Sequence, residues 1–405
     1  MAIKRRNFLK LSSTAIVAGM TGKVFGHKVQ EGDSMVEEAA RKVGRLPRRK
    51  LGYSGRDISF LIGAGDMDNL VMEAGVLCGI NYWHKANRWM DSGAPETILK
   101  NREAHYCQVT VDRVGGDHFR GHMDEEAHYR FVKEAVEKTG LGYFDDMQLH
   151  YGYHNTDELK NDRSFVRAFE RLKKEGLVKH LCLSQHSYAG SPRVENGQSA
   201  AEVLTAVVED GMYEHAQFMY SYGGDPEMDE FIEFARKRNF GTIAMKTARG
   251  IGRMKEDQAF ISGLPADVSP HNAMVRWLST KTQLDAAVIR VRNLNEFTET
   301  YAGAGKEPSA ADVMALGMMS AEADAAVCRL CGKCQGHCPQ HIPITDILRF
   351  ERYAMDDHDW SKATGLYKGL PVKGDVCNDC GNCVQNCPLN LQIPAKLAKA
   401  HIMLA

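Results

Sequence analysis

Between residues 51 and 303, short apolar runs alternate with longer stretches whose apolar residues recur at helical spacing. This alternation is typical of repeated strand and helix units around a parallel sheet. The runs predict eight strands: Ile58–Ile62, Ile80–Trp83, Tyr106–Val111, Phe144–Leu149, Val178–Leu183, Ala216–Tyr220, Gly241–Met245 and Ala286–Arg290. Eight such units in roughly 250 residues predict an α/β fold, a (β/α)8 TIM barrel over residues 49–303. An open doubly wound sheet is the alternative, but no GxGxxG follows an early strand.

Two long helices stand out within this region, Glu125–Thr139 and Asp157–Glu175. In the second, apolar residues from Phe165 onward recur at helical spacing while Lys and Arg occupy the other face. Shorter helices are predicted at Ser34–Val43 and Asn295–Tyr301.

The last quarter of the chain carries two copies of the pattern C-x2-C-x2-C-x3-C-P. This run holds [4Fe-4S] clusters, because three thiolates on one tight loop bind three iron corners and a more distant Cys binds the fourth. In two-cluster ferredoxins the fourth Cys of each copy binds the other cluster. We therefore predict one cluster on Cys328, Cys331, Cys334 and Cys387, and another on Cys377, Cys380, Cys383 and Cys338.

Structural zinc and disulfides are the alternatives for these cysteines. Zinc needs four ligands per site, which leaves the evenly spaced third Cys and the Cys-Pro endings unexplained. Three cysteines on one loop are also poor disulfide partners. Residues 304–405 are thus expected to form a linker helix, capped by Ser309, and a mainly α, ferredoxin-like iron-sulfur domain. The 38 residues between Cys338 and Cys377 predict an inserted helix or loop.

The N-terminal residues predict an export signal. Basic residues from Lys4 to Lys10 precede a weakly apolar run, residues 11–20, that is too short to span a bilayer. The stretch Arg5-Arg6-Asn7-Phe8-Leu9-Lys10 resembles a twin-arginine signal; a basic disordered tail is the alternative. We predict a signal region over residues 1–30, a linker over 31–48, and export to the periplasm by the twin-arginine machinery, with no transmembrane span in the mature protein. A net charge of −1 gives no electrostatic case for nucleic acid.

Four stretches of the predicted barrel resemble landmarks of the aldo/keto reductase family: Arg49–Ser59, Ala74–Trp83, Tyr143–His150 and Ala244–Lys246. The tail resembles the ferredoxin-like extension of an iron-sulfur branch of the same family. The resemblance implies a barrel that binds NADP(H) at its C-terminal mouth and reduces carbonyls with a Tyr acid assisted by Lys, Asp and His.

This chain departs from that catalytic pattern. The Asp position of the family falls on His84 and the Tyr position on Trp89, while Thr110 lies where the Lys is expected. Only the His has a counterpart, His150. An indole N–H does not give up its proton at accessible pH, so carbonyl reduction by the usual route is not expected.

The signals for a nicotinamide cofactor are mixed. Ser184, Gln217 and Lys246 fall on or near positions that face the cofactor in the family. The Pro-Gly turn that approaches the phosphates is replaced by Ile289-Arg290, whose side chains occupy space that Gly leaves open. NADP(H) is therefore an open alternative rather than an expected cofactor.

The predicted mouth is rich in other polar groups, and function in this fold collects at that face. We expect His150 and His84 to carry protons, and Lys246 with Gln185 to orient a substrate. A metal ion bound by His84, His150 and His186 is the minority alternative. The full set of expected substrate- or cofactor-binding residues is Trp89, Ser184, Gln185, His186, Gln217, Tyr220 and Arg292.

Two classes of function follow. The first is an exported oxidoreductase that couples two-electron chemistry on a small molecule at the mouth to one-electron transfer through two [4Fe-4S] clusters and a redox protein partner. The second is a non-catalytic electron-transfer or docking subunit that uses the barrel as a scaffold. An NADP-dependent carbonyl reductase is a weaker third. An open mouth between the histidines favours the enzyme, and a mouth filled by Trp89 favours the scaffold.

Overall fold

The computed structural model describes residues 34–117, 119–189, 191, 193–224, 226–248, 251, 262–265, 268–356 and 358–405. The predicted signal region, residues 1–30, lies outside the described residues. The predicted short helix over residues 34–43 is present. Within these ranges, none of the helices has the length and apolar character needed to span a bilayer.

Eight parallel strands close into a barrel, so the predicted (β/α)8 fold is confirmed and the open sheet is excluded. The strands are β3 (Leu61–Ala64), β4 (Tyr82–His84), β5 (Tyr106–Val111), β6 (Phe144–Leu149), β7 (Val178–Gln185), β8 (His215–Met219), β9 (Gly241–Met245) and β10 (Ala286–Val288). All eight C-terminal ends therefore meet at one rim, which brings side chains from distant parts of the sequence together.

The first predicted strand, Ile58–Ile62, is wrong in its placement. The run is divided between β2 (Arg56–Ser59), which pairs antiparallel with β1 (Arg48–Leu51), and the first barrel strand, β3. Phe60 lies at the corner and donates its backbone N–H to the carbonyl of Pro47 at 2.8 Å. One apolar run thus serves two sheets, and the β1–β2 hairpin packs its apolar residues against the base of the barrel.

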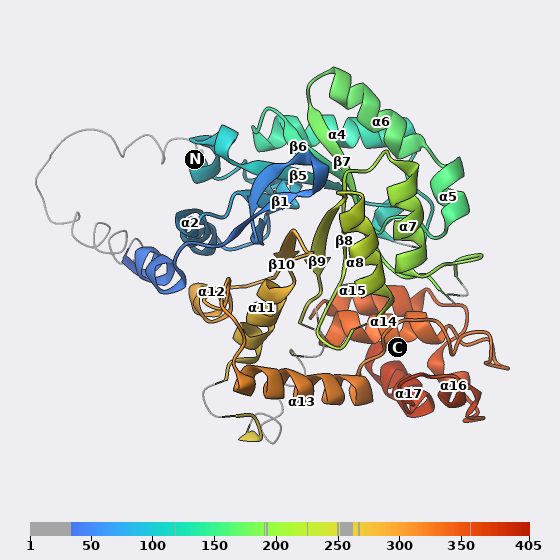
Figure 1. Ribbon diagram of the computed structural model, residues 1–405. Helices are drawn as coiled ribbons and strands as arrows, with labels where there is room; N and C mark the ends of the chain where they lie inside the picture. The colour runs from blue at the N-terminus through green and yellow to red at the C-terminus, as the bar shows by residue number, and fades with distance from the viewer. Residues whose placement is uncertain are drawn as a thin grey trace, which may run out of the picture.

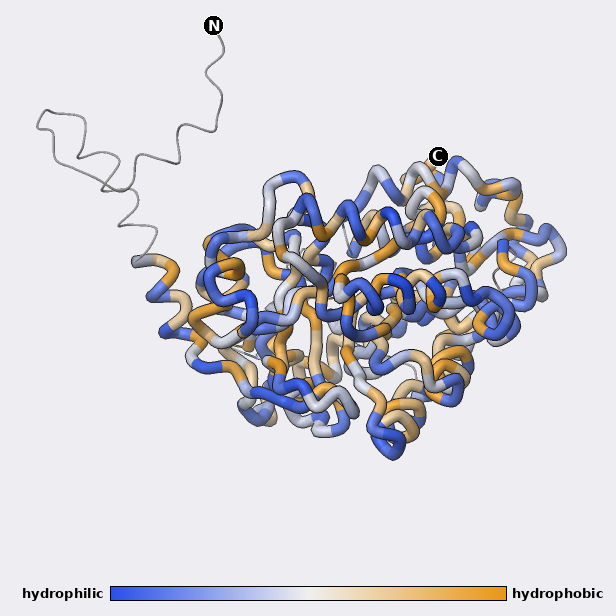
Figure 2. Tube along the Cα trace, turned by 90° about the horizontal axis from the view of Figure 1, so that it is seen from above, coloured by the Kyte–Doolittle hydropathy of each residue, from blue (hydrophilic) through white to orange (hydrophobic). Residues whose placement is uncertain are grey.

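Helices surround the barrel on its outside (Figure 1). They are α2 (Asn69–Cys78), α3 (Glu96–Leu99), α4 (Glu125–Thr139), α5 (Thr156–Asn161), α6 (Ser164–Lys174), α7 (Ala200–Asp210), α8 (Glu227–Lys237), α11 (Pro270–Thr280) and α12 (Leu294–Tyr301). The prediction for α4 is confirmed at both ends, and that for α12 within one residue. Hydrophobic stretches run along the strands and the inward helix faces, and hydrophilic ones along the periphery (Figure 2).

The single helix predicted over Asp157–Glu175 is wrong, because it is two helices, α5 and α6. Asp162 leaves the helical conformation between them, with ψ at 99°. Its carboxylate accepts hydrogen bonds from Ser164, at 3.0 Å from the backbone nitrogen and 2.7 Å from Oγ. A side chain that accepts from the backbone in this way starts a new helix, which the hydrophobic spacing alone does not reveal.

The C-terminal region is mainly α, as predicted. Its helices are α13 (Ala310–Ala326), α14 (Ile344–Met355), α15 (Trp360–Lys368), α16 (Asn382–Gln385) and α17 (Ile393–Leu404). Ser309 caps α13 in a capping box with Asp312, which confirms that prediction. Helices α14 and α15 form the predicted insertion between the two cysteine motifs.

The insertion is docked on the loops of the barrel mouth. Arg349 of α14 donates from Nη2 to the carbonyl of Ser187 at 2.5 Å. Ser191 contacts both carboxylate oxygens of Asp346, at 2.9 and 3.1 Å. Residues of the barrel loops, Tyr188 among them, also belong to the hydrophobic core of the C-terminal helices. The two regions therefore share a core rather than meeting through a linker alone.

Candidate functional site

A cavity of about 600 Å³ lies between the barrel mouth and the insertion. The barrel contributes His84, Lys85, Asp112, His150, Tyr151, His186, Gln217 and Lys246, among others. The insertion contributes Tyr353, Asp359, Ser361, Lys362, Gly365 and Leu366. The three histidines predicted for the mouth all line this one space.

His150 is held by a carboxylate. It follows β6, and its Nδ1 hydrogen-bonds Oδ1 of Asp112, which follows β5. Burial, and next the charge of Lys85, lower the pKa of His150 to about 4 against the opposing effect of Asp112. His150 is therefore neutral at pH 7. Because a carboxylate only accepts, Nδ1 carries the proton and Nε2 keeps its lone pair.

Asp112 remains ionised beside it. Burial opposes ionisation, but the hydrogen bond and charge of His150, together with Lys85 and Lys362, bring the pKa of Asp112 below its ordinary value.

His84 is held by the amide of Gln108. Its Nδ1 lies 2.6 Å from Oε1 of Gln108 and 3.1 Å from Nε2 of Gln217. Burial, followed by the charge of Lys85, places the pKa of His84 well below its ordinary value. The shorter contact assigns the proton to Nδ1, since the Gln108 oxygen only accepts, and the Gln217 nitrogen is then a neighbour of Nδ1 and not its hydrogen-bond donor. Two neutral imidazoles thus each keep an acceptor at Nε2.

His186 follows β7 and its burial, then the charge of Lys246, lower its pKa well below the ordinary value. Its ring lies 5.3 Å from that of Tyr151. Among the described residues, the ligand atoms of His84, His150 and His186 do not all lie within 4.8 Å of one another. The structure therefore does not favour a single metal ion held by the three histidines.

Three residues at the mouth have a left-handed backbone that side chains rarely adopt: Lys85 (φ 54°), Tyr151 (φ 69°) and Lys246 (φ 53°). Such conformations cost about 1–3 kcal/mol each and concentrate at functional sites. The ring of Tyr151 stacks on His150 at 3.8 Å. Its hydroxyl accepts a hydrogen bond from Nζ of Lys362 at 2.7 Å, so an insertion residue reaches the barrel site.

The other predicted residues divide into two groups. Ser184 and Gln217 line the cavity. Gln185 does not: its amide pins the backbone of Tyr153 through bonds of 3.0 and 2.7 Å, so it supports the loop after β6. Ser184 also accepts from the backbone of Tyr151 at 3.1 Å.

Trp89, Tyr220 and Arg292 lie off the cavity wall. Trp89 is buried behind the wall with its ring 6.3 Å from that of Trp83. Tyr220 donates its hydroxyl to Asp229 at 2.5 Å. Arg292 is exposed, and Arg290 lines the cavity instead. Trp89 therefore does not fill the mouth.

Sequence reasoning missed Asp112 and Lys362. Asp112 directly follows the predicted strand Tyr106–Val111, so its position in the sequence could have predicted its place at the mouth. No sequence pattern predicted Lys362 at the mouth, because it lies in the insertion between the cysteine motifs and reaches the cavity only where the insertion docks on the barrel.

Seven of the eight motif cysteines lie in the two groups that the crossed assignment predicts. Cys328, Cys331, Cys334 and Cys387 line one small pocket together with apolar residues that include Leu391. Cys383 interacts electrostatically with Cys377 and Cys338. Cys380, the eighth, is exposed. The chemistry of these thiolate sets fits [4Fe-4S] clusters, which would supply one-electron transfer when bound.

The first cysteine loop touches the barrel. A Cβ on Gly332 would lie 2.2 Å from the carbonyl oxygen of Ala189, in the loop after β7. Only glycine allows this approach. The donor set nearer the barrel is therefore that of Cys328, Cys331 and Cys334.

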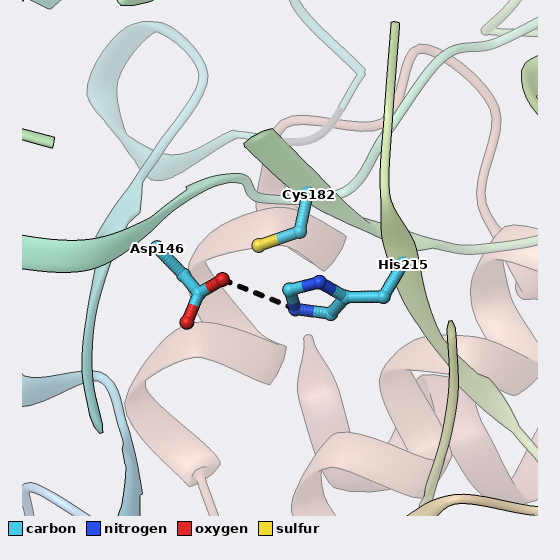
Figure 3. A group of neighbouring side chains, drawn as sticks. All are labelled: Asp146, Cys182 and His215. Carbon is cyan, nitrogen blue, oxygen red and sulfur yellow. Dashed lines mark ion pairs between the residues drawn. The ribbon is translucent and has the colours of Figure 1, made fainter. Parts of the chain in front are cut away.

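A second cluster of polar groups lies deep in the barrel (Figure 3). Ligand atoms of Asp146, Cys182 and His215 lie within 4.8 Å of one another. Arg56, however, donates to both carboxylate oxygens of Asp146 at 2.7 Å each. A cation there would meet that guanidinium, so we assign the cluster a structural role; Cys182 is a buried free thiol, as predicted.

The residues expected near cofactor phosphates fit a dinucleotide poorly. The guanidinium of Arg290 lies 3.7 Å from the carboxylate of Asp66, so it already has an anionic partner. Residues 249–250 and 252–261, in the loop after β9, lie outside the described residues. NADP(H) therefore stays the alternative that the sequence predicted.

Residues 320–388 match the family model of the 4Fe-4S dicluster domain, which confirms the predicted class of the C-terminal domain. No curated protein matches the chain. A protein of Pseudomonas aeruginosa described as an aldo-keto reductase is 16% identical, with 67% of this chain and 98% of that chain covered and a TM-score of 0.49. The holo form of an aldo-keto reductase of Bacillus halodurans is 13% identical, with 68% and 96% covered and a TM-score of 0.48. These likenesses are too weak to carry an argument about activity.

Proposed function

We propose that the protein is an exported iron-sulfur oxidoreductase of aldo/keto reductase type, in which a small organic substrate reacts in the cavity at the barrel mouth. Two-electron chemistry there is coupled to one-electron transfer through the cysteine-bound clusters to or from a redox protein partner. One observation carries the proposal: three barrel histidines and helix α15 of the iron-sulfur region line the same cavity.

His150 and His84 handle the protons of the reaction. Each keeps Nε2 as an acceptor because Asp112 and Gln108 engage the respective Nδ1. A neutral imidazole can take a proton from a substrate hydroxyl, and the same group returns it in the reverse direction.

Tyr151 supplies a hydroxyl on a ring that stacks on His150. Burial raises its pKa, so it stays protonated at neutral pH. An ammonium group only donates, so Lys362 bonds the hydroxyl oxygen and the hydroxyl proton points elsewhere. Tyr151 thereby takes the place of the proton donor that Trp89 cannot be.

The non-catalytic scaffold is the rival function. A scaffold predicts a mouth filled by Trp89, whereas Trp89 is packed behind the cavity wall. An NADP-dependent reductase is the weaker rival, and nicotinamide titration of the purified protein tests it directly.

Export rests on the residues around Arg5 and Arg6. The twin-arginine pathway is known for carrying folded proteins, which suits a chain that must acquire its clusters in a reducing compartment. Replacing both arginines by Lys should leave the protein in the cytoplasm on fractionation; an unchanged periplasmic fraction would contradict the proposal.

The function is tested on anaerobically purified protein. We expect iron, sulfide and electron paramagnetic resonance signals of two [4Fe-4S] clusters, and turnover of an organic alcohol or carbonyl with an artificial one-electron dye. Variants His150→Ala and His84→Ala should lose turnover while keeping both clusters. Turnover that survives in both variants would contradict the assigned site.

A further inference from the structure

We propose that the cavity binds an organic anion whose carboxylate lies among Lys85, Lys246 and Lys362. This inference names the substrate class for the oxidoreductase proposed above, and it rests on that function only in calling the ligand a substrate.

The three lysines come from different elements and meet at one space. Lys85 follows β4, Lys246 follows β9, and Lys362 belongs to α15, yet all three line the cavity. The ammonium groups of Lys246 and Lys362 lie 4.9 and 4.4 Å from the same ring, that of Tyr353. Burial lowers the pKa of Lys85, and the charge of Lys246 adds to this effect while that of Asp112 opposes it. Gathering like charges in a partly buried space is unfavourable, and an anion relieves that repulsion.

The backbone holds two of these lysines in place at a conformational cost. Lys85 and Lys246 have φ values of 54° and 53°, each directly after a barrel strand. An asparagine or glycine would adopt this conformation more readily. A lysine at both positions therefore indicates that the ammonium groups are needed there.

The cavity wall also carries four carboxylates. Two of them, Asp66 and Asp117, are offset by arginines, and the three lysines together with Arg88 outnumber the other two, so the wall keeps room for an external anion. The contacts of the four carboxylates are Asp66 with Arg290, Asp112 with His150, Asp117 with Arg193, and Asp359 with the backbone nitrogen of Lys362. Lys362 also acts electrostatically on Asp112, His150 and His186, so an anion beside it is close to the proposed acid-base groups.

The test is calorimetric titration of the anaerobic holoprotein at constant ionic strength. The probes are succinate, its uncharged diamide, and inorganic phosphate. We expect succinate to bind and the diamide not to bind. The double variant Lys246→Met and Lys362→Met should weaken succinate binding at least about tenfold, as expected for lost charged hydrogen bonds.

Two control variants separate charge from folding. Lys362→Arg keeps the charge and should keep binding, and Lys368→Met changes an exposed lysine of the same helix and should bind as the unaltered protein does. Equal binding of the diamide, tighter binding of phosphate than of succinate, or unchanged binding by the double variant would overturn the inference.

The titration needs no turnover, so the inference and the proposed function fail separately. Succinate binding without any dye-linked turnover would support the anion site and count against the enzyme. Turnover confined to uncharged alcohols or carbonyls would support the enzyme and count against the anion site.

Discussion

At the scale of single residues, the cavity keeps its imidazoles neutral among lysines. Burial lowers the pKa of His150 to about 4, and Lys85 adds to the effect. A neutral histidine is a competent base at pH 7, whereas a protonated one is not. The lysines that would attract an anion therefore also help to keep the neighbouring histidines unprotonated at pH 7.

The contact between Asp112 and His150 predicts the effect of Asp112→Asn. An amide can donate to Nδ1, which would move the imidazole proton to Nε2 and remove the acceptor from the cavity. Dye-linked turnover should fall on the order of a hundredfold or more, with the iron content unchanged. Asp157→Asn, at an exposed position of α5, is the matched control. Equal turnover in both variants would show that Asp112 does not orient His150.

His128, a buried histidine outside the cavity, predicts that the fold loses stability in acid. His128 of α4 packs edge-on against Phe165 of α6 at 5.0 Å, and burial lowers its pKa to about 4. The unfolded chain has an ordinary histidine pKa of about 6.5 and so binds a proton first as pH falls. Stability should therefore be full above about pH 6.5 and decline towards pH 4.

The variant His128→Met removes this titration. Its thermal midpoint should depend less on pH between 7 and 5 than that of the unaltered protein. The control variant His358→Gln, at an exposed position, should keep the pH dependence of the unaltered protein. An identical pH dependence in His128→Met and the unaltered protein would show that His128 is accessible to protons in the fold.

At the scale of elements, the two cysteine loops make the sharpest prediction. If the crossed assignment holds, Cys331→Ser and Cys387→Ser act on the same cluster, so the double variant should keep as much iron as either single one, roughly four per chain. Cys380→Ser with Cys387→Ser should lose both clusters. Iron analysis with electron paramagnetic resonance checks this, and Cys182→Ser, a buried thiol of the barrel, is the control.

The opposite pattern would contradict the crossed arrangement. In that case Cys387 would share its cluster with Cys380, and the pair Cys331→Ser and Cys387→Ser would abolish both signals.

Elements could be predicted where the pattern is local. Helix Glu125–Thr139 has its own cap at Asp124 and stop at Gly140, so its bounds follow from the sequence. The run Ile58–Ile62 could not be assigned correctly, because an apolar run does not say which sheet each residue joins. The break at Asp162 depends on a side chain that accepts from the next helix rather than on hydrophobic spacing.

At the scale of the whole molecule, the site depends on how the two regions dock. Barrel topology predicted that His84, His150 and His186 would share one rim, since the C-terminal ends of parallel strands meet there. Lys362 and Tyr353 could not be predicted, because their place follows from the shared core between α14 and the barrel loops. The iron-sulfur region is thus part of the cavity wall, which joins the proposed chemistry to the proposed electron path.

The coupling between chemistry in the cavity and electron transfer through the clusters is tested most directly by a single-turnover measurement under anaerobic conditions. Protein reduced with dithionite and freed of excess reductant is mixed with a panel of oxo acids, and the visible absorbance of the clusters is followed. The account predicts that at least one oxo acid reoxidises the clusters, and that Lys362→Met and Asp112→Asn slow this step while Lys368→Met does not. Clusters that stay reduced with every oxo acid, or that reoxidise equally fast in all variants, would contradict it.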